Sequence, residues 1–266
     1  MGTSTHNKGQ NGKTPLIPSW LQEPDSNEEA DVGKESIFTV GSKNRFTIPR
    51  GEFTRFIKSR DLGMARRSIS NYVKKTMQGS SKATLRLGSA RYSSAKLLKI
   101  AGLYASGGVV AIEKEFSLFE LANKSADDVF IYIADFICPD GGSVDEGIAR
   151  DAYFSAIEEC PELSTIKFSD LLPEQICILL EITMANTVFS RIINDIGNKI
   201  ILLPKDYAEA DALGIQIKEY IRGAVSDAMV DTGIDINCLP KNKTLEIIDD
   251  VYRKTFDILA DAGENE

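Results

Sequence analysis

The segment Ser143–Glu159, with the sequence SVDEGIARDAYFSAIEE, decides the fold class. Ser143 and Glu146 have the spacing of a capping box, in which the two side chains satisfy the free backbone N–H groups at the start of a helix. The turn sequence Pro139-Asp140-Gly141-Gly142 comes directly before it. We therefore predict a helix that begins after Ser143 and ends near Glu159.

Helical patterns also occur on both sides of this segment. Between 64 and 78, the apolar residues that share one side of a helix are Ile69, Tyr72, Val73 and Met77. Ser125-Ala126-Asp127-Asp128 resembles a further capping box, and Ala105-Ser106-Gly107-Gly108 is typical of a helix end. The chain has no repeat of fixed period and no regular alternation of strands and helices. We predict an all-α fold, a multi-helix body with a disordered N-terminal tail, whose other helices span roughly residues 51–60, 64–78, 82–104, 174–196, 208–231 and 244–262.

Charge divides the chain into three parts, although the net charge of the whole chain is only −8. Residues 1–44 carry four basic and six acidic residues, a net charge of −2. Residues 45–104 carry fourteen basic and two acidic residues, a net charge of +12, and residues 105–266 carry thirteen basic and thirty-one acidic residues, a net charge of −18. We predict a flexible tail over 1–44 with a Pro/Trp anchor, a basic helical segment over 45–104 and an acidic helical body over 105–266.

Histidine and cysteine usage excludes several classes of enzyme. The only histidine, His6, lies in the tail, so a Ser-His-Asp triad, a Cys-His dyad or a histidine-ligated metal centre has no ordered histidine to use. No CxxC pair occurs among the four cysteines, and we interpret them as buried reduced thiols: Cys138, Cys160, Cys177 and Cys238. We expect no catalytic residue, no metal and no cofactor bound by this chain, and we predict that it is not an enzyme.

Two further patterns resemble ligand sites. Gly12-Lys13-Thr14 is the end of a phosphate-binding loop motif, but Asn7 stands where the motif needs glycine, so we reject that interpretation. The second pattern resembles a metal-binding cluster of carboxylates and consists of Asp140, Asp145, Glu146 and Asp151. Acidic residues also favour a helix N-terminus without any metal, and we prefer that structural interpretation.

The basic segment leaves two interpretations open. Clustered Lys and Arg bind nucleic-acid phosphates by releasing counterions, but the same charges would also complement the acidic body or an acidic partner protein. The predicted helices lack the interleaved Tyr and Phe of a base-stacking surface, which favours the second interpretation. The residues that we assign to the basic surface are Arg66, Arg67, Lys74, Lys75, Arg86 and Arg91.

Hydropathy indicates a cytoplasmic protein without a membrane partner. No stretch approaches eighteen consecutive apolar residues, and the N-terminus lacks the apolar core of a signal peptide. Reduced thiols fit the same compartment.

The N-terminus is the remaining reactive feature. Gly2 is small enough that the initiator Met1 is normally removed, which exposes an α-amine. An α-amine has a pKa of about 8, below the roughly 10.4 of a lysine, so a useful fraction is unprotonated and nucleophilic at neutral pH. The segment from Gly2 to Pro15 can extend on the order of 45 Å, far enough to enter a tunnel in a partner enzyme. His6 stands where the myristoylation motif needs Ser or Thr. On these residues alone, an idle tail remains the alternative.

Four segments of the chain carry a family resemblance. Two lie in the tail, Met1-Gly2-Thr3-Ser4-Thr5 and Thr14-Pro15-Leu16-Ile17-Pro18-Ser19-Trp20-Leu21. Two are internal, Arg86-Leu87-Gly88-Ser89-Ala90-Arg91 and Asp140–Ala152, with the sequence DGGSVDEGIARDA. In this order, from Met1 to Ala152, they resemble the QatB family, a component of the four-gene Qat anti-phage defence systems.

The resemblance implies a non-enzymatic subunit that acts with partner proteins. Those partners are a QueC-like enzyme (QatC), an ATPase (QatA) and a TatD-like nuclease (QatD). The QueC-like enzyme resembles ligases that use ATP to join a 7-deazaguanine to an N-terminal glycine, and in this chain that acceptor is Gly2. The residues expected to be held by the partner are Thr3, Ser4, Thr5, Pro15, Leu16, Ile17, Pro18, Trp20 and Leu21. The alternative is a nucleic-acid-binding adaptor that uses the basic helices of 45–104.

Overall fold

The structure of the chain is a computed structural model, and it describes residues 45–138, 142–197, 207–240 and 243–263. In these ranges the chain is helical and has no strand, so the prediction of an all-α fold is confirmed. The tail predicted over 1–44 lies outside the described residues. The α-helices are α1 (Thr47–Ser59), α2 (Leu62–Asn71), α3 (Ser80–Leu85), α4 (Ala90–Phe116), α5 (Ala126–Tyr132), α6 (Ala134–Ile137), α7 (Val144–Glu158), α8 (Pro173–Ile196), α9 (Tyr207–Thr232) and α10 (Thr244–Asp261). Shorter turns are a π-helical turn, η2 (Tyr72–Thr76), and three 3₁₀ turns, η3 (Pro161–Ser164), η4 (Phe168–Asp170) and η5 (Ile236–Cys238).

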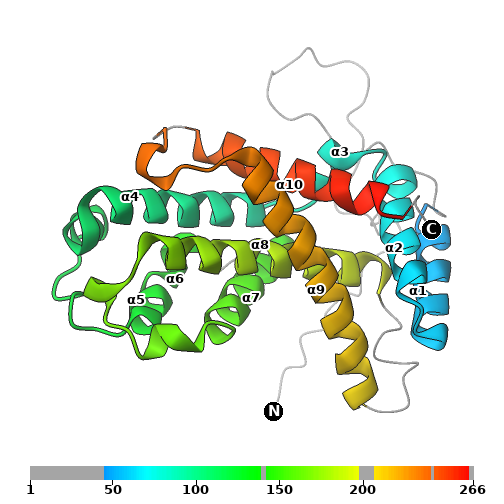
Figure 1. The fold of residues 1–266 in the computed structure, drawn as a ribbon, viewed down its shortest axis with the longest axis horizontal. Coiled ribbons are helices and arrows are strands. Elements are labelled where there is room, and N and C mark those ends of the chain that lie inside the picture. Colours follow the sequence, from blue (N-terminus) through cyan, green and yellow to red (C-terminus); the bar gives the residue numbers. More distant parts are fainter. Residues whose placement is uncertain (1–44, 139–141, 198–206, 241–242, 264–266) are drawn as a thin grey trace, which may run out of the picture. The chain divides into compact units, whose positions relative to one another are not determined.

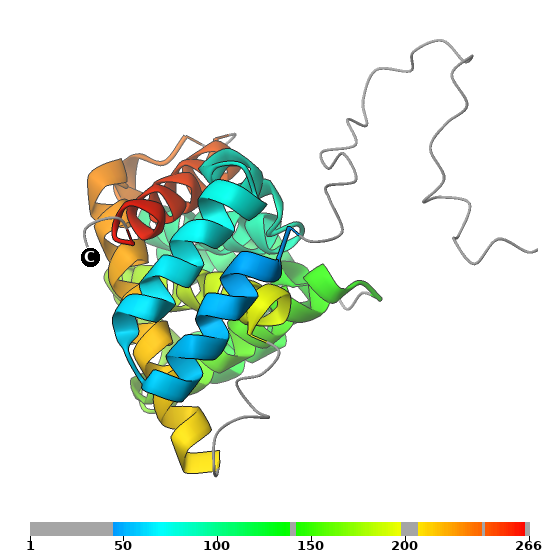
Figure 2. The ribbon, with the colours of Figure 1, turned by 90° about the vertical axis from the view of Figure 1, so that its right-hand side faces the viewer.

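Helix α8 lies at the centre of the helical body. It packs against α4, α7 and α9, and Figure 1 shows α4 running beside it and α9 crossing it. Side chains on nearly every side of α8 are buried, which requires neighbours all around the helix. Helix α10 covers α4 and also contacts α9, α3 and α2. At one end of the body, α1 and α2 lie side by side (Figure 2).

One hydrophobic core joins the basic segment to the acidic body. Helix α4 passes from residue 104 to residue 105 within a helical stretch, so the change of charge does not coincide with the end of an element. Core residues come from both sides of this point: Phe53, Ile69 and Leu98 from the basic segment, and Leu180, Ile221 and Phe256 from the acidic body. The two segments therefore stabilise each other by burial of apolar surface.

The helix end predicted at Ala105–Gly108 is confirmed as a break in the helix. Gly108 has non-helical backbone angles and separates two helical stretches, which together make up α4. Gly108 has φ 57° and ψ −149°, a conformation that a glycine adopts without the steric cost of a Cβ. The apolar run Val109–Ile112 forms the helical turn after this break.

Of the two predicted capping boxes, one is present. The Glu146 backbone N–H donates to Ser143 Oγ over 3.2 Å, and the Ser143 backbone N–H donates to Glu146 Oε2 over 3.0 Å. These hydrogen bonds favour the charged carboxylate and lower the pKa of Glu146. The Ser125 side chain makes no capping bond. A backbone contact takes its place, because the Ala126 N–H donates to the Ile166 carbonyl over 2.9 Å.

Two helices among the described residues, α4 and α8, are long and apolar enough to cross a membrane by length and composition alone. A core helix of a soluble protein meets the same criteria. In α8, 67% of the apolar window is buried inside the body, and in α4 the corresponding share is 39%.

The cysteines are free thiols in three different environments. Cys138 and Cys160 are buried, as predicted, but Cys177 is half-buried and Cys238 is exposed. The prediction is therefore wrong for Cys238, which lies in the short turn η5 after the end of α9 rather than on the core side of a helix. Burial raises the pKa of both Cys160 and Cys177 to about 11, and it also raises the pKa of Cys138.

We predict that one thiol of the native protein reacts quickly with dithionitrobenzoate at neutral pH and that three react slowly. The thiolate is the reactive species, and burial suppresses it at the three other positions. The variant Cys238→Ser should lose the fast phase, measured as absorbance against time. A fast phase that persists in this variant would contradict the structure.

Candidate functional site

Asp195, in the last turn of α8, is the centre of a buried polar network. Its side chain is only 4% exposed. The Tyr72 hydroxyl donates to Asp195 Oδ2 over 2.9 Å, and Arg86 donates through Nε and Nη2 to the two carboxylate oxygens over 3.2 and 3.0 Å. Arg50 donates to the backbone carbonyl of the same residue over 2.9 and 2.8 Å. Three residues of the basic segment thus converge on one residue of the acidic body.

Arg191 extends this network toward α7. It lies one turn before Asp195 on α8, and its side chain is 1% exposed. Its Nη2 bonds to Oδ1 of Asp145, which lies in the first turn of α7. A buried guanidinium is costly unless it is paired, so the ion pair holds α7 in one position against α8.

The network changes the chemistry of Tyr72. Burial and the adjacent charge of Asp195 raise the pKa of the Tyr72 hydroxyl well above its usual value. The hydroxyl therefore stays protonated at neutral pH and acts as a hydrogen-bond donor. This arrangement positions side chains and places no nucleophile in a cleft.

The two internal segments that resemble the family motifs meet at this network. Gly88 has a φ of +57°, and a Cβ at this position would lie 2.3 Å from Oδ2 of Asp145. Arg86, two residues earlier, bonds to Asp195. The segment 86–91 thus needs its glycine because the Asp145 carboxylate occupies the space that a side chain would fill.

A small pocket of 220 Å³ opens beside the two motifs. Ser89, Tyr92 and Lys96 line it from the N-terminal part of α4 and the turn before it, and Glu146 lines it from α7. The Tyr92 side chain is 54% exposed. Lys96 Nζ donates to the Phe136 carbonyl over 2.7 Å, and Phe136 is 40% exposed. Exposed aromatic side chains next to a pocket are typical of a protein-binding surface.

Four of the six residues assigned to a basic surface contact the acidic body. Arg86 bonds to Asp195, and Arg91 bonds to Asp249 with a side chain that is 12% exposed. Lys74 Nζ lies 3.4 Å from an Asp261 oxygen, and the Arg66 guanidinium lies over the Tyr220 ring at 5.3 Å. Arg86 and Arg91 therefore occupy ion pairs inside the body instead of a free basic surface.

The two other basic residues have a different environment. Lys75 is exposed and Arg67 is half-buried. Neither takes part in an ion pair with the part of the chain that the structure describes.

The carboxylates considered as a metal cluster have separate partners. Asp145 is paired with Arg191, and Glu146 caps α7. Asp151 is exposed, and Asp140 lies outside the described residues. Within the described ranges, no group of three or more His, Cys, Asp or Glu residues could hold a metal ion.

The predicted tail residues all lie outside the described residues. These are Gly2, Thr3, Ser4, Thr5, Pro15, Leu16, Ile17, Pro18, Trp20 and Leu21. Sequence reasoning missed Tyr72, Arg191, Asp195 and Asp249 as functional partners of the basic residues. A usable signal existed for Arg191 and Asp195, which stand four residues apart near the end of a largely apolar helix and therefore share one face.

Comparison with known families gives one match. A family model described as "Qat anti-phage system associated protein QatB" matches residues 79–259, more than half of the chain. No curated protein and no solved structure matches the chain. The matched region runs from just before α3 into the last turn of α10, and it contains Arg86, Gly88, Asp145 and Asp195.

We predict that Gly88→Ala destabilises the protein by about 2 kcal/mol or more, because alanine disfavours the positive φ and its Cβ displaces Asp145 from Arg191. Gly147→Ala is the matched control, since a Cβ there meets nothing within 4 Å. This control should leave the free energy of unfolding unchanged or raise it by up to about 1 kcal/mol. Urea denaturation measures both, and equal effects would contradict the close contact of Gly88 with Asp145.

We also predict that Asp195→Asn lowers the free energy of unfolding by about 2 kcal/mol, because it leaves the Arg86 guanidinium without its carboxylate partner. This figure is below the cost for a fully buried pair, since Arg86 is 30% exposed. Asp135→Asn is the control, because this carboxylate is 80% exposed and pairs with Arg150. The control should change stability by less than about 0.5 kcal/mol. Similar losses for the two variants would show that the network contributes little.

Proposed function

The chain belongs to the QatB family of Qat anti-phage system proteins, and from this premise we propose that it is the substrate and scaffold subunit of a Qat complex. Its enzymatic partner is the QueC-like subunit, QatC, which modifies Gly2 with a 7-deazaguanine. The ATP and the 7-deazaguanine derivative are used by that partner, and this chain itself is not an enzyme. The QatA ATPase and the QatD nuclease are further candidates for binding to the body, in the cytoplasm.

The reaction requires only an amine from this chain. The partner uses ATP to activate the carboxyl group of the 7-deazaguanine. The Gly2 α-amine attacks the activated carboxyl carbon, the ATP-derived group leaves, and the nitrogen loses a proton as the amide forms. An α-amine is suited to this step at neutral pH because its pKa is about 8, below that of lysine. Glycine adds no side chain that would block a narrow tunnel.

The observation that carries the scaffold role is the placement of Arg86 and Arg91. Both guanidinium groups bond to carboxylates of the acidic body, so neither is available to neutralise a phosphate. The charge contrast between 45–104 and 105–266 thus contributes to holding the helices together. This use of charge supports a protein-binding body over a nucleic-acid adaptor.

The surface around Tyr92 and Phe136 is our candidate for the contact with the QueC-like subunit. It combines exposed aromatic side chains with the 220 Å³ pocket, and the residues of both internal motifs line that pocket. Aromatic residues in such positions commonly supply a large part of the binding energy of an interface.

The test is the intact mass of the full chain after co-expression with the QueC-like subunit of its own system. We expect a mass increase equal to one carboxylated 7-deazaguanine less one water, located on the N-terminal peptide by fragmentation. Gly2→Ala should reduce the modified fraction at least about tenfold, since one added methyl group in a close-fitting site costs that much. Gly9→Ala makes the same change outside the reacting residue and should be modified normally.

An unmodified Gly2, together with phage protection that is retained when Gly2 is blocked, would refute the proposal. Variants that test the nucleic-acid alternative must leave Arg86 and Arg91 unchanged, because charge reversal at either position would break an ion pair of the body. Arg67→Glu with Lys75→Glu is the suitable pair. If the chain binds nucleic acid through 45–104, this double variant should weaken binding and reduce its dependence on salt, and it should leave the modification of Gly2 unchanged.

A further inference from the structure

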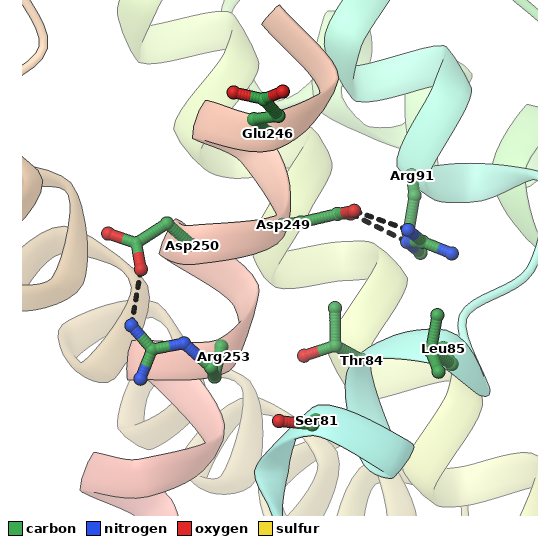
Figure 3. Close-up of a pocket in the computed structure, with 8 residues that line it drawn as sticks. All are labelled: Ser81, Thr84, Leu85, Arg91, Glu246, Asp249, Asp250 and Arg253. Atoms are coloured by element: carbon green, nitrogen blue, oxygen red, sulfur yellow. Dashed lines mark hydrogen bonds and ion pairs between the residues drawn. The ribbon is translucent and has the colours of Figure 1, made fainter. Parts of the chain in front are cut away.

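A second pocket, of 390 Å³, lies between α3 and α10. Figure 3 shows Thr84 on α3, Arg91 at the start of α4, and Glu246, Asp249 and Arg253 on α10 around this space. Asp250 also lines the pocket. The lining therefore includes three carboxylates, two guanidinium groups and a threonine hydroxyl.

Most of these charges already have partners. Arg91 bonds to both carboxylate oxygens of Asp249, with Nε donating to Oδ1 over 2.6 Å. The largest effect on Arg91 is this hydrogen bond, which raises its pKa. Arg253 bonds to Asp250, and its second nitrogen, Nη1, lies 3.3 Å from Asp257 Oδ2. The two arginines are thus held against carboxylates and do not project freely into the pocket (Figure 3).

Glu246 is the exception among the acidic residues of the pocket. It lies in the first turn of α10, and none of the residues that the structure describes forms a hydrogen bond or an ion pair with it. With Asp249 and Asp250 matched by Arg91 and Arg253, Glu246 is the carboxylate of the pocket that has no side-chain partner among the described residues; it is exposed to water and lies at the N-terminus of α10. A bound cation would be attracted there.

Thr84 supplies a second, independent observation. The residue is 3% exposed, and its Oγ1 has no hydrogen-bond partner in the described ranges. Thr84 lines the pocket, and Figure 3 shows its hydroxyl oxygen directed from α3 toward α10. A buried hydroxyl without a partner is costly, so a ligand N–H group at this position would restore a missing hydrogen bond.

We propose that this pocket binds the ammonium or guanidinium group of a basic side chain on a partner protein, which donates to the Thr84 hydroxyl and is attracted by the exposed Glu246 carboxylate at the edge of the pocket. The site adjoins the surface around Tyr92, because the Arg91 guanidinium lies over the Tyr92 ring at 5.8 Å, but its lining residues are different. Its occupation does not depend on the modification of Gly2. An anionic ligand does not fit, because it would face the three carboxylates while both arginines are already bonded. An arginine side chain suits the space, since its planar head donates several hydrogen bonds at once.

The experiment is a titration of the isotopically labelled full chain with the capped tripeptide acetyl-Gly-Arg-Gly-amide, followed by NMR. We expect saturable shifts of the amide signals of residues 81–91 and 246–253, which weaken as ionic strength rises. The capped peptide with lysine in place of arginine should also bind, and the one with glutamate should not. A parallel titration with methylguanidinium chloride shows whether a free small cation binds as a peptide side chain does.

Matched variants locate the site. Glu246→Gln keeps the shape of the side chain and removes its charge, and it should weaken binding of the arginine peptide at least about fivefold. Thr84→Val keeps the shape and removes the hydroxyl, and it should also weaken binding. Glu158→Gln makes the same charge change at an exposed position of α7 and should leave binding unchanged.

Several results would overturn the proposal. One is the absence of saturable shifts with either basic peptide. Another is binding that Glu246→Gln and Thr84→Val leave unaltered, and a third is binding of methylguanidinium without binding of the peptides. Binding of the arginine peptide to a chain whose Gly2 is unmodified would support this pocket even if the role proposed for Gly2 failed.

Discussion

The bond of Arg86 to the Asp195 carboxylate connects the basic segment to the acidic body, and other parts of the structure depend on it. A carboxylate that is 4% exposed requires cationic or donor partners, and Arg86 and Tyr72 provide them. Arg50 ties α1 to the same turn of α8 through the Asp195 carbonyl. The charge contrast along the chain therefore has a structural use, because part of the positive charge is placed against negative charge inside one folded unit.

Local signals in the sequence predicted much of the fold. The capping box at Ser143 and the apolar periodicity of 64–78 depend on neighbouring residues. Helix α7 begins at the predicted position, and the periodic stretch forms α2 followed by the π-helical turn η2. Prediction was wrong where tertiary contacts decide the outcome. The single helix predicted over 82–104 is divided into α3 and α4 around Gly88, whose positive φ accommodates the Asp145 carboxylate, and the start of α5 uses the Ile166 carbonyl in place of the Ser125 side chain.

The polar network could not be predicted from spacing, because its partners are far apart in the chain. Arg86 and Asp195 are separated by 109 residues, and Arg91 and Asp249 by 158. For this reason, sequence patterns alone assign all six basic residues to a surface, although two of them, Arg86 and Arg91, form ion pairs with Asp195 and Asp249. The tail residues belong to a different case, since their proposed role depends on a partner enzyme. For this QatB-family protein, our proposal gives the helical body and the N-terminus separate tasks: the body binds partners and the terminus is modified.

A double-mutant cycle between Arg86→Met and Asp195→Asn tests the coupling of the two segments most directly. The free energies of unfolding of the wild type, both single variants and the double variant are measured by urea denaturation. We expect a coupling energy of at least about 1 kcal/mol, because either single change leaves the other residue without its partner. Additive effects, with a coupling energy near zero, would contradict the account.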